Sequence, residues 1–279
     1  MRWTRGERSS NLEDRRFQTG ARRGISIGLG GFLLLFILSL LFKQDFFSLL
    51  GPAMDVSPGP ADSTAAREAS PAEEELVDFM SFVLDDTQST WSQLLGGRYR
   101  EAQMVLFRDL DQSACGYAQS ASGPFYCPGD EKVYLDLSFF DELRRRFGAP
   151  GDFAQAYVIA HEMGHHIQKV LGIEVQVRQA QGSRPDQANE FSVLMELQAD
   201  CFAGVWGHSA AQRGVLESGD VEEGLNAAAA IGDDRIQRMS GGSVMPESFT
   251  HGSSEQRVTW LRRGLNSGNP EDCDTFSAR

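Results

Sequence analysis

Two histidines stand four residues apart inside an apolar stretch, and a glutamate follows the first of them. Residues 161–165 read His-Glu-Met-Gly-His, directly after the Ala-Tyr-Val-Ile-Ala run at 156–160. On an α-helix, positions i and i+4 lie one above the other on the same face, so two imidazoles can hold one cation between them. The intervening carboxylate can then reach a water molecule at that cation. The chain is therefore expected to contain a largely buried helix with ligand groups along one face.

A second predicted helix, from about 186 to 207, carries the carboxylates Glu196 and Asp200 four residues apart. Small residues at 199, 203 and 204 favour close helix packing, which would turn these carboxylates inward. Catalytic zinc sites use three protein ligands and leave one position for water. We therefore predict Zn²⁺ as the cofactor, with His161, His165 and Glu196 as ligands and Asp200 accepting a hydrogen bond from His161. A solvated acidic edge is the alternative for the two carboxylates.

The glutamate between the histidines predicts hydrolytic chemistry. Zinc lowers the pKa of its water to about 7, and Glu162 is placed to accept the proton as general base. His251, in a Gly- and Ser-rich turn, is the candidate for stabilising the oxyanion, the alternative being a purely structural histidine. Arg257 either pairs with an acidic group of the site or lies on the surface. His166 and His208 are expected to make structural contacts only.

Residues 25–42 form an 18-residue stretch without a charged side chain. As a helix it would span about 27 Å, close to the thickness of a bilayer core. Arginines at 15, 16, 22 and 23 precede it, so the positive-inside bias places the N-terminus in the cytoplasm. We predict a single-pass protein of the cell (inner) membrane with a periplasmic or extracellular catalytic domain. A cleaved signal peptide is the alternative, although no small-x-small site follows promptly. A cytosolic core helix conflicts with the length and the arginine flank.

The predicted organisation is a basic cytoplasmic segment (1–24), a transmembrane anchor (25–42), a flexible linker rich in Gly, Pro and Ser (43–69) and one catalytic domain (70–279). Residues 1–42 carry a net charge of +4, so the total of −13 leaves −17 on the remainder. Nucleic acid is excluded as a partner on this basis, because phosphate binding requires clustered Lys and Arg.

Capping patterns and hydrophobic periodicity predict a mostly helical α+β domain with a small antiparallel sheet. Residues 133–137 are a candidate edge strand for an extended peptide substrate. The predicted strands span 103–107 and 132–137, and the predicted helices are Ser70 to about Leu95, Ser138 to Gly148, Asp152 to Gly172, 186–207, and two that begin at Asp220 and Ser253.

Four cysteines, Cys115, Cys127, Cys201 and Cys273, contain no Cys-x-x-Cys pair, which argues against a thiolate zinc cage. In an oxidising compartment they allow three disulfide pairings. The pairing we favour joins Cys115 to Cys127 across a short loop and Cys201 to Cys273 between a core helix and the C-terminal tail.

These motifs resemble known zinc peptidases. The 161–165 motif followed by Glu196-x-x-x-Asp200 is similar to the gluzincin class, and Glu-Leu-x-Ala-Asp is also similar to the membrane-associated Ste24/HtpX peptidases. The segments 115–118, 123–128, 134–136, 161–168 and 251–257 resemble the bacterial "putative neutral zinc metallopeptidase" family over about residues 70–276.

The resemblance implies a zincin-like fold and a membrane-anchored peptidase that hydrolyses peptide bonds with a zinc-bound water activated by Glu162. Its implied partners are a peptide or protein substrate and the lipid bilayer. The alternative is a non-catalytic zinc-binding extracytoplasmic module that binds a membrane partner. Glu162 favours the enzyme, because a purely structural site has no use for a water-activating carboxylate.

Overall fold

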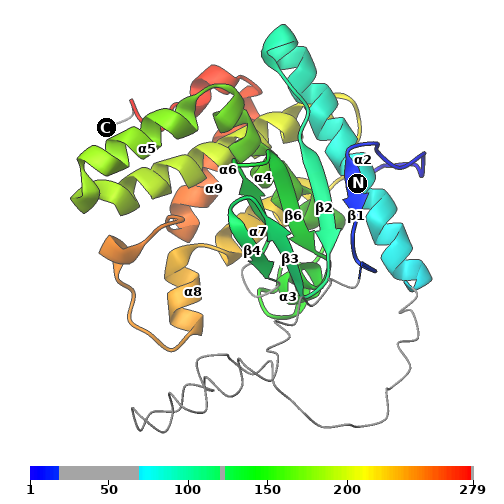
Figure 1. Ribbon diagram of the computed structural model, residues 1–279, viewed down its shortest axis with the longest axis horizontal. Coiled ribbons are helices and arrows are strands. Elements are labelled where there is room, and N and C mark those ends of the chain that lie inside the picture. Colours follow the sequence, from blue (N-terminus) through cyan, green and yellow to red (C-terminus); the bar gives the residue numbers. More distant parts are fainter. Residues whose placement is uncertain (19–68, 120–122, 278–279) are drawn as a thin grey trace, which may run out of the picture. The chain divides into compact units, whose positions relative to one another are not determined.

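The computed structural model describes residues 1–18, 69–119 and 123–277 (Figure 1). Met1–Arg16 and Ala69–Arg279 form one compact unit, and Phe17–Glu68 is assigned to a second. The predicted anchor at 25–42 and almost all of the predicted linker lie outside the described residues. Within the described ranges, no helix has both the length and the apolar character that a bilayer crossing requires.

A four-stranded sheet with the order β1-β2-β6-β5 lies at the centre of the compact unit. β1 (Leu12–Asp14), β2 (Gln103–Phe107) and β6 (Lys132–Asp136) run parallel to one another, and β5 (Phe125–Cys127) pairs antiparallel with β6. A separate antiparallel hairpin joins β3 (Leu110–Ser113) to β4 (Gly116–Gln119). The prediction of an antiparallel sheet was therefore wrong for most of its pairings. β6 is paired on both sides, so it is not the edge strand that the sequence suggested.

Residues 1–16 pack on the same unit as the rest of the domain, unlike the separate segment 1–24 that the sequence suggested. Main-chain hydrogen bonds join Met104 N to Asn11 O and Arg15 N to Leu106 O, both at 2.8 Å. Arg16 lies 2.9 Å from Glu73 and 2.7 Å from Glu74. One of the four arginines that were predicted to flank a membrane segment therefore pairs with the acidic first turn of the following helix.

The helix α2 (Pro71–Leu95) follows the predicted signals closely. Ser70 accepts a hydrogen bond from Glu73 N, proline occupies the first turn, and Gly96 ends the helix with a positive φ of 55°. Its buried face includes Val77, Met80, Val83 and Trp91. This face packs on the helix that carries the histidines.

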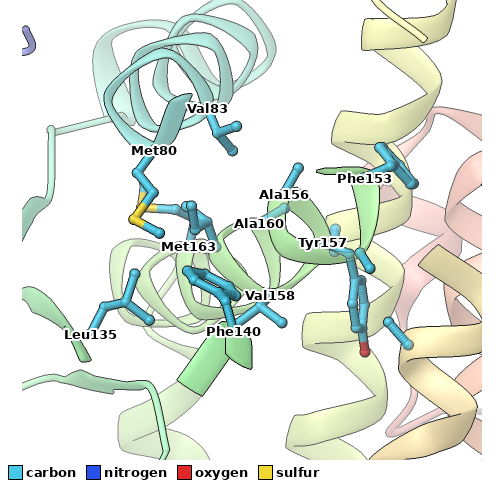
Figure 2. Packing of buried hydrophobic residues seen from close by; sticks show 14 of the residues in the cluster. Met80, Val83, Leu135, Phe140, Phe153, Ala156, Tyr157, Val158, Ala160 and Met163 are labelled. Carbon is cyan, nitrogen blue, oxygen red and sulfur yellow. The ribbon is translucent and has the colours of Figure 1, made fainter. Parts of the chain in front are cut away.

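That helix, α4 (Asp152–Val170), is the centre of the core. It contacts α2, β5 and three further helices, α5 (Ile173–Ser183), α6 (Ala188–Gln212) and α7 (Asp220–Ala230). Figure 2 shows Met80 and Val83 of α2 facing Ala160 and Met163 of α4, with Leu135 of β6 and Phe140 of α3 (Ser138–Arg145) nearby. Apolar packing on several sides fixes α4, so the polar groups on its remaining face are held rigidly.

The C-terminal part is completed by α8 (Asp233–Met239) and α9 (Ser254–Ser267), which begins with a capping box of Ser253 and Gln256. At two other expected helix starts, Asp152 and Asp220, no side-chain cap forms. Asp152 is the first residue of α4 and caps nothing, and Glu223 accepts from Phe153 N at 3.2 Å instead of closing a capping box. In the described part of the chain, short 3₁₀ segments lie at Gly96–Arg98, Pro185–Gln187, Pro246–Ser248 and Pro270–Cys273.

Both favoured disulfides are present. Cys115 joins Cys127, which ties β5 to the turn of the β3–β4 hairpin, and Cys201 of α6 joins Cys273 in the C-terminal 3₁₀ segment. The second crosslink closes a loop of 72 residues around α7, α8 and α9. It holds the C-terminal tail against the helix that also carries Glu196.

Candidate metal and catalytic site

The three predicted metal ligands come together between α4 and α6. One ligand atom each from His161, His165 and Glu196 lies within 4.8 Å of the others. His161 Nε2 is 3.1 Å from Glu196 Oε2, and His165 Nε2 is 3.4 Å from Glu196 Oε1. Two imidazole nitrogens and one carboxylate form a donor set that suits zinc and leaves room for a fourth group.

A glycine inside the motif makes this approach possible. A Cβ at Gly164 would lie 2.9 Å from both the Cα and the carbonyl oxygen of Ala199 on α6, closer than real Cβ contacts allow. The missing side chain lets the backbones of α4 and α6 approach directly between the two histidines. The small residues of α6 were predicted to serve this purpose, and Ala199 does. Gly204 instead packs against α9, where a Cβ would lie 2.2 Å from Leu261 O.

Glu162 lines the same cavity as the three predicted metal ligands. The cavity has a volume of about 620 Å³ and is lined by α3, α4, α5, α6, β5 and the turn at His251. Glu162 is 8% exposed, so its carboxylate is largely withdrawn from bulk water. A carboxylate placed beside a three-ligand metal set, in a cavity large enough for part of a peptide, is the arrangement expected for a general base.

His161 is aimed by a buried polar network. Its Nδ1 donates to Asp200 Oδ1 at 2.8 Å, and the hydroxyl of Tyr157 donates to the same oxygen at 2.5 Å. Arg257 forms a bidentate salt bridge with Asp200, in which Nε lies 2.8 Å from Oδ2 and Nη2 lies 2.9 Å from Oδ1. The bidentate pair fixes the carboxylate, and the carboxylate fixes the imidazole. Arg257 is therefore a buried partner of Asp200 and not a surface residue.

The electrostatics of this network favour a cation at the two Nε2 atoms. Burial alone would lower the pKa of His161, but Asp200 and Glu196 outweigh it and raise the pKa to about 10. Burial would likewise raise the pKa of Asp200, but Arg257 and His161 lower it to about 2. The pKa of Glu196 falls well below its ordinary value because the two histidines outweigh burial. Both carboxylates thus stay ionised and attract positive charge to the site.

The other ligand histidine has a neutral partner. His165 Nδ1 lies 2.9 Å from Oε1 of Gln168, a fully buried amide three residues further along α4. Both Nδ1 atoms are thereby engaged away from the cavity. The two Nε2 atoms remain directed at Glu196, as metal ligation requires.

His251 lines the cavity but does not belong to the group of three ligands. Its Nδ1 is 3.1 Å from Asp233 Oδ1, and Asp233 Oδ2 accepts the main-chain N–H groups of Thr250 and His251 at 2.7 Å each. The hydrogen bond that the His251 ring donates to Asp233 is the main cause that raises the pKa of His251. A donor held at the cavity wall in this way suits charge that develops on a substrate oxygen.

The two remaining histidines make structural contacts, as expected. His166 Nε2 donates to Arg100 O at 2.7 Å, and its Nδ1 accepts from the Tyr126 hydroxyl at 3.0 Å, which joins α4 to β5. His208 Nδ1 donates to Leu265 O at 2.8 Å and so links α6 to α9.

Three residues of the site were missed in the sequence. Tyr157 and Gln168 stand four residues before His161 and three after His165, so helical spacing alone could have placed them on the ligand face. Asp233 has no such signal, because it precedes His251 by 18 residues and belongs to another element.

Comparison with known proteins places this site in a family. The model described as "Putative neutral zinc metallopeptidase" matches residues 1–276. "Uncharacterized protein YpfJ" of Escherichia coli strain K12 is 48% identical over 286 residues, which cover 99% of each chain. "Uncharacterized protein Rv2575" of Mycobacterium tuberculosis strain H37Rv is 44% identical over 206 residues, 70% of this chain and 68% of that protein. No solved structure matched the chain. The resemblance predicted from the motifs is confirmed, and the chain belongs to the putative neutral zinc metallopeptidase family.

Proposed function

We propose that this chain is a zinc-dependent peptidase that hydrolyses peptide bonds of peptides or proteins. The observation that carries the proposal is that Glu162 and the group of His161, His165 and Glu196 open on one cavity. When bound there, zinc would polarise the scissile carbonyl and lower the pKa of water. A non-catalytic zinc module would need the three ligands but not a buried carboxylate beside them.

The chain's own residues supply the remaining chemistry. Glu162 accepts the proton of the attacking water and delivers it to the leaving amine. His251, oriented by Asp233, donates to the oxygen on which negative charge develops. The Asp200–Arg257 pair keeps His161 in one tautomer throughout, so the geometry of the site need not reorganise during the reaction.

The substrate main chain is proposed to bind along β5. Among the described residues this strand is one of the two edges of the sheet, and Phe125 and Tyr126 line the cavity. An unpaired strand edge offers main-chain donors and acceptors to an extended peptide with little choice of side chain. The disulfide at Cys127 and the Tyr126–His166 hydrogen bond hold the strand in place.

Attachment to a membrane through residues 25–42 is our proposal for localisation, supported by the length and apolar character of that stretch. The pairing of β1 with β2 adds a condition, because residues 12–14 and 103–107 must then share one compartment. A single crossing at 25–42 would separate them. We therefore propose that the bilayer is a partner and that residues 12–14 and 103–107 lie on the same side of it.

Substitution of the general base tests the proposed activity. Glu162→Gln should retain zinc at the wild-type stoichiometry and lower kcat for a peptide substrate by about 10²–10⁴-fold. A chelator should abolish wild-type cleavage, and added zinc should restore it. Glu142→Gln is the matched control, because Glu142 lines the same cavity from α3 and is expected to leave kcat unchanged. Full activity of Glu162→Gln would remove the assignment.

A further inference from the structure

A chain of side-chain amides connects His165 to the C-terminal tail. Gln168 Oε1 lies 2.9 Å from His165 Nδ1, and Gln168 Nε2 lies 2.7 Å from Met195 O. The same Nε2 is 3.1 Å from Oε1 of Gln198, whose own Nε2 is 3.0 Å from Cys273 O. Both glutamines are buried, at 0% and 4% exposure. Buried polar groups are almost always hydrogen-bonded, so each donor and acceptor of these two amides is expected to have a partner.

The two main-chain carbonyls fix the direction of every hydrogen bond in this chain. A carbonyl oxygen only accepts, so Gln198 turns its NH₂ toward Cys273 and its Oε1 toward Gln168. Gln168 then donates to Gln198 and to Met195, and its Oε1 faces His165. The imidazole must therefore donate from Nδ1. Neither amide can flip without setting two donors or two acceptors against each other.

We propose that Gln168 is a positioning residue that holds His165 with a proton on Nδ1 and with Nε2 aimed at the cation site. The inference rests on the proposed function, because it takes His165 as a zinc ligand. The N–H of a ligand histidine is usually fixed by a carboxylate, a carbonyl or water. Here the two ligand histidines are held differently, His161 by the charged Asp200 and His165 by a neutral relay.

The surroundings of His165 favour an uncharged hydrogen-bond partner at Nδ1. The charge of Asp200 is balanced by Arg257 at 2.8 Å, whereas the relay contains amides and carbonyls only. A second buried carboxylate without such a partner would carry a large desolvation cost. An amide aims the imidazole without adding that charge.

The far end of the relay is anchored covalently. Cys273 is bonded to Cys201, which lies on α6 three residues after Gln198. The accepting carbonyl is therefore held at a fixed place along the helix that also carries Glu196. The disulfide thus connects the tail to the metal site through two glutamines.

The test measures zinc affinity and the tautomer of His165 in the full chain. Zinc Kd is obtained by competition with a chromophoric chelator, and the tautomer from ¹⁵N shifts of the histidine rings in metal-free protein, where only five histidines contribute. Gln168→Met removes the acceptor at similar volume. We expect zinc Kd to rise about 10–100-fold and the Nδ1–H form of His165 to be lost.

Gln181→Met is the matched control. Gln181 lines the cavity that contains the candidate metal ligands. It joins α5 to α6 through hydrogen bonds of 3.0 Å to Ala188 O and Ser192 Oγ, away from those ligands. Its substitution should leave zinc Kd and the tautomer of His165 unchanged. An effect equal to that of Gln168→Met would show a general packing defect and overturn the proposal.

Two further variants separate orientation from packing. Gln168→Glu keeps an acceptor toward His165 and should bind zinc more tightly than Gln168→Met, although its buried charge should lower the free energy of unfolding. If Gln168→Met does not fold, Gln198→Met tests the relay with Gln168 in place. Gln198→Met should weaken zinc binding alone but have no further effect in the Gln168→Met background, because both glutamines act along one path.

The outcomes distinguish the relay from the function on which it rests. Equal zinc Kd for wild type and Gln168→Met, or a His165 that stays Nδ1–H in that variant, would overturn the role of Gln168. A wild-type chain that binds no zinc would overturn the proposed function instead. The tautomer in metal-free protein would still decide what Gln168 does.

Discussion

Asp233 shows how one carboxylate can organise a cavity wall without touching a metal ligand. It accepts three main-chain N–H groups, from Thr250, His251 and Gly252, and one hydrogen bond from the His251 ring. The main-chain bonds fix the turn, and the side-chain bond fixes the direction of the imidazole. The position of His251 is thus set by an element other than its own.

This arrangement predicts the alkaline limit of activity. The hydrogen bond that His251 donates to Asp233 raises the pKa of His251 above its ordinary value. Glu196 acts in the same sense, and burial and Arg257 oppose it. Protonated His251 is the stronger donor, so its help is complete below the ordinary pKa of about 6.5 and is lost as pH rises through the raised pKa. Asp233→Asn should move the alkaline limb of kcat/KM to lower pH.

The measurement is a pH profile of kcat/KM for wild type, Asp233→Asn and His251→Gln. His251→Gln should lose about 10²-fold in kcat and no longer show the limb that Asp233 shifts. An alkaline limb that is identical in wild type and Asp233→Asn would exclude His251 as the titrating donor.

At the scale of single residues, the sequence could predict what helical spacing encodes. His161, His165, Glu196 and Asp200 were found because each pair repeats at four residues on one face. Arg257 could not be placed, because its burial depends on α9 packing against α6. Helix periodicity predicts which residues share a face, whereas the residues that contact this face are determined by tertiary packing.

Among the elements, the contact between α4 and α6 controls the site most directly. The two helices touch where Gly164 meets Ala199, one residue before His165 and three residues after Glu196. Any group inserted there would separate the ligands on one helix from the ligand on the other. The spacing of α4 and α6 therefore sets the distance between the two histidines and Glu196.

Gly164→Ala should test this coupling. The added methyl would meet Ala199 backbone at 2.9 Å, and overpacking of this kind costs about 1–3 kcal/mol. The gain in helix propensity returns only about 1 kcal/mol. We expect a lower free energy of unfolding in chemical denaturation and weaker zinc binding.

Gly182→Ala provides the control, because Gly182 also lies in a helix, α5, and an added Cβ would have no neighbour within 4 Å. It should gain stability from helix propensity and leave zinc binding unchanged. Equal zinc affinity for Gly164→Ala and wild type would show that the helices can separate without moving the ligands.

Helix limits were largely predictable, but sheet topology was not. Ser70, Gly96 and the Ser253–Gln256 box mark helix ends through local hydrogen bonds that a sequence displays directly. The parallel pairing of β1 with β2 joins segments that are far apart in the sequence, and no local pattern reveals such a partner. Residues 1–16 were assigned to a membrane flank because their arginines were considered without the acidic residues that they meet.

At the scale of the whole molecule, residues 1–16 belong to the same compact unit as the helices that carry the candidate metal ligands. Arg16 is 4% exposed and pairs with Asp14, Glu73 and Glu74 at 2.6–2.9 Å. Together with the β1–β2 pairing, these ion pairs predict that both parts of the chain lie on the same side of any membrane.

Cysteine labelling in cells should show this common side. Glu7→Cys and Gln179→Cys introduce exposed thiols at the N-terminal segment and on α5, and the four natural cysteines are paired in disulfides. A membrane-impermeant maleimide should label both variants or neither before the cells are permeabilised. Labelling of only one would mean that β1 does not pair with β2 in the cell.

The strand β1 also sets an order of events during folding. Leu12 pairs with Met104, a separation of 92 residues (104 − 12), whereas Tyr126 and Val133 are only 7 apart (133 − 126). Closing the longer loop costs about 2 kcal/mol more chain entropy. The first strand to leave the ribosome is therefore among the last to dock. Until it docks, one flank of β2 stays open to any other extended chain nearby.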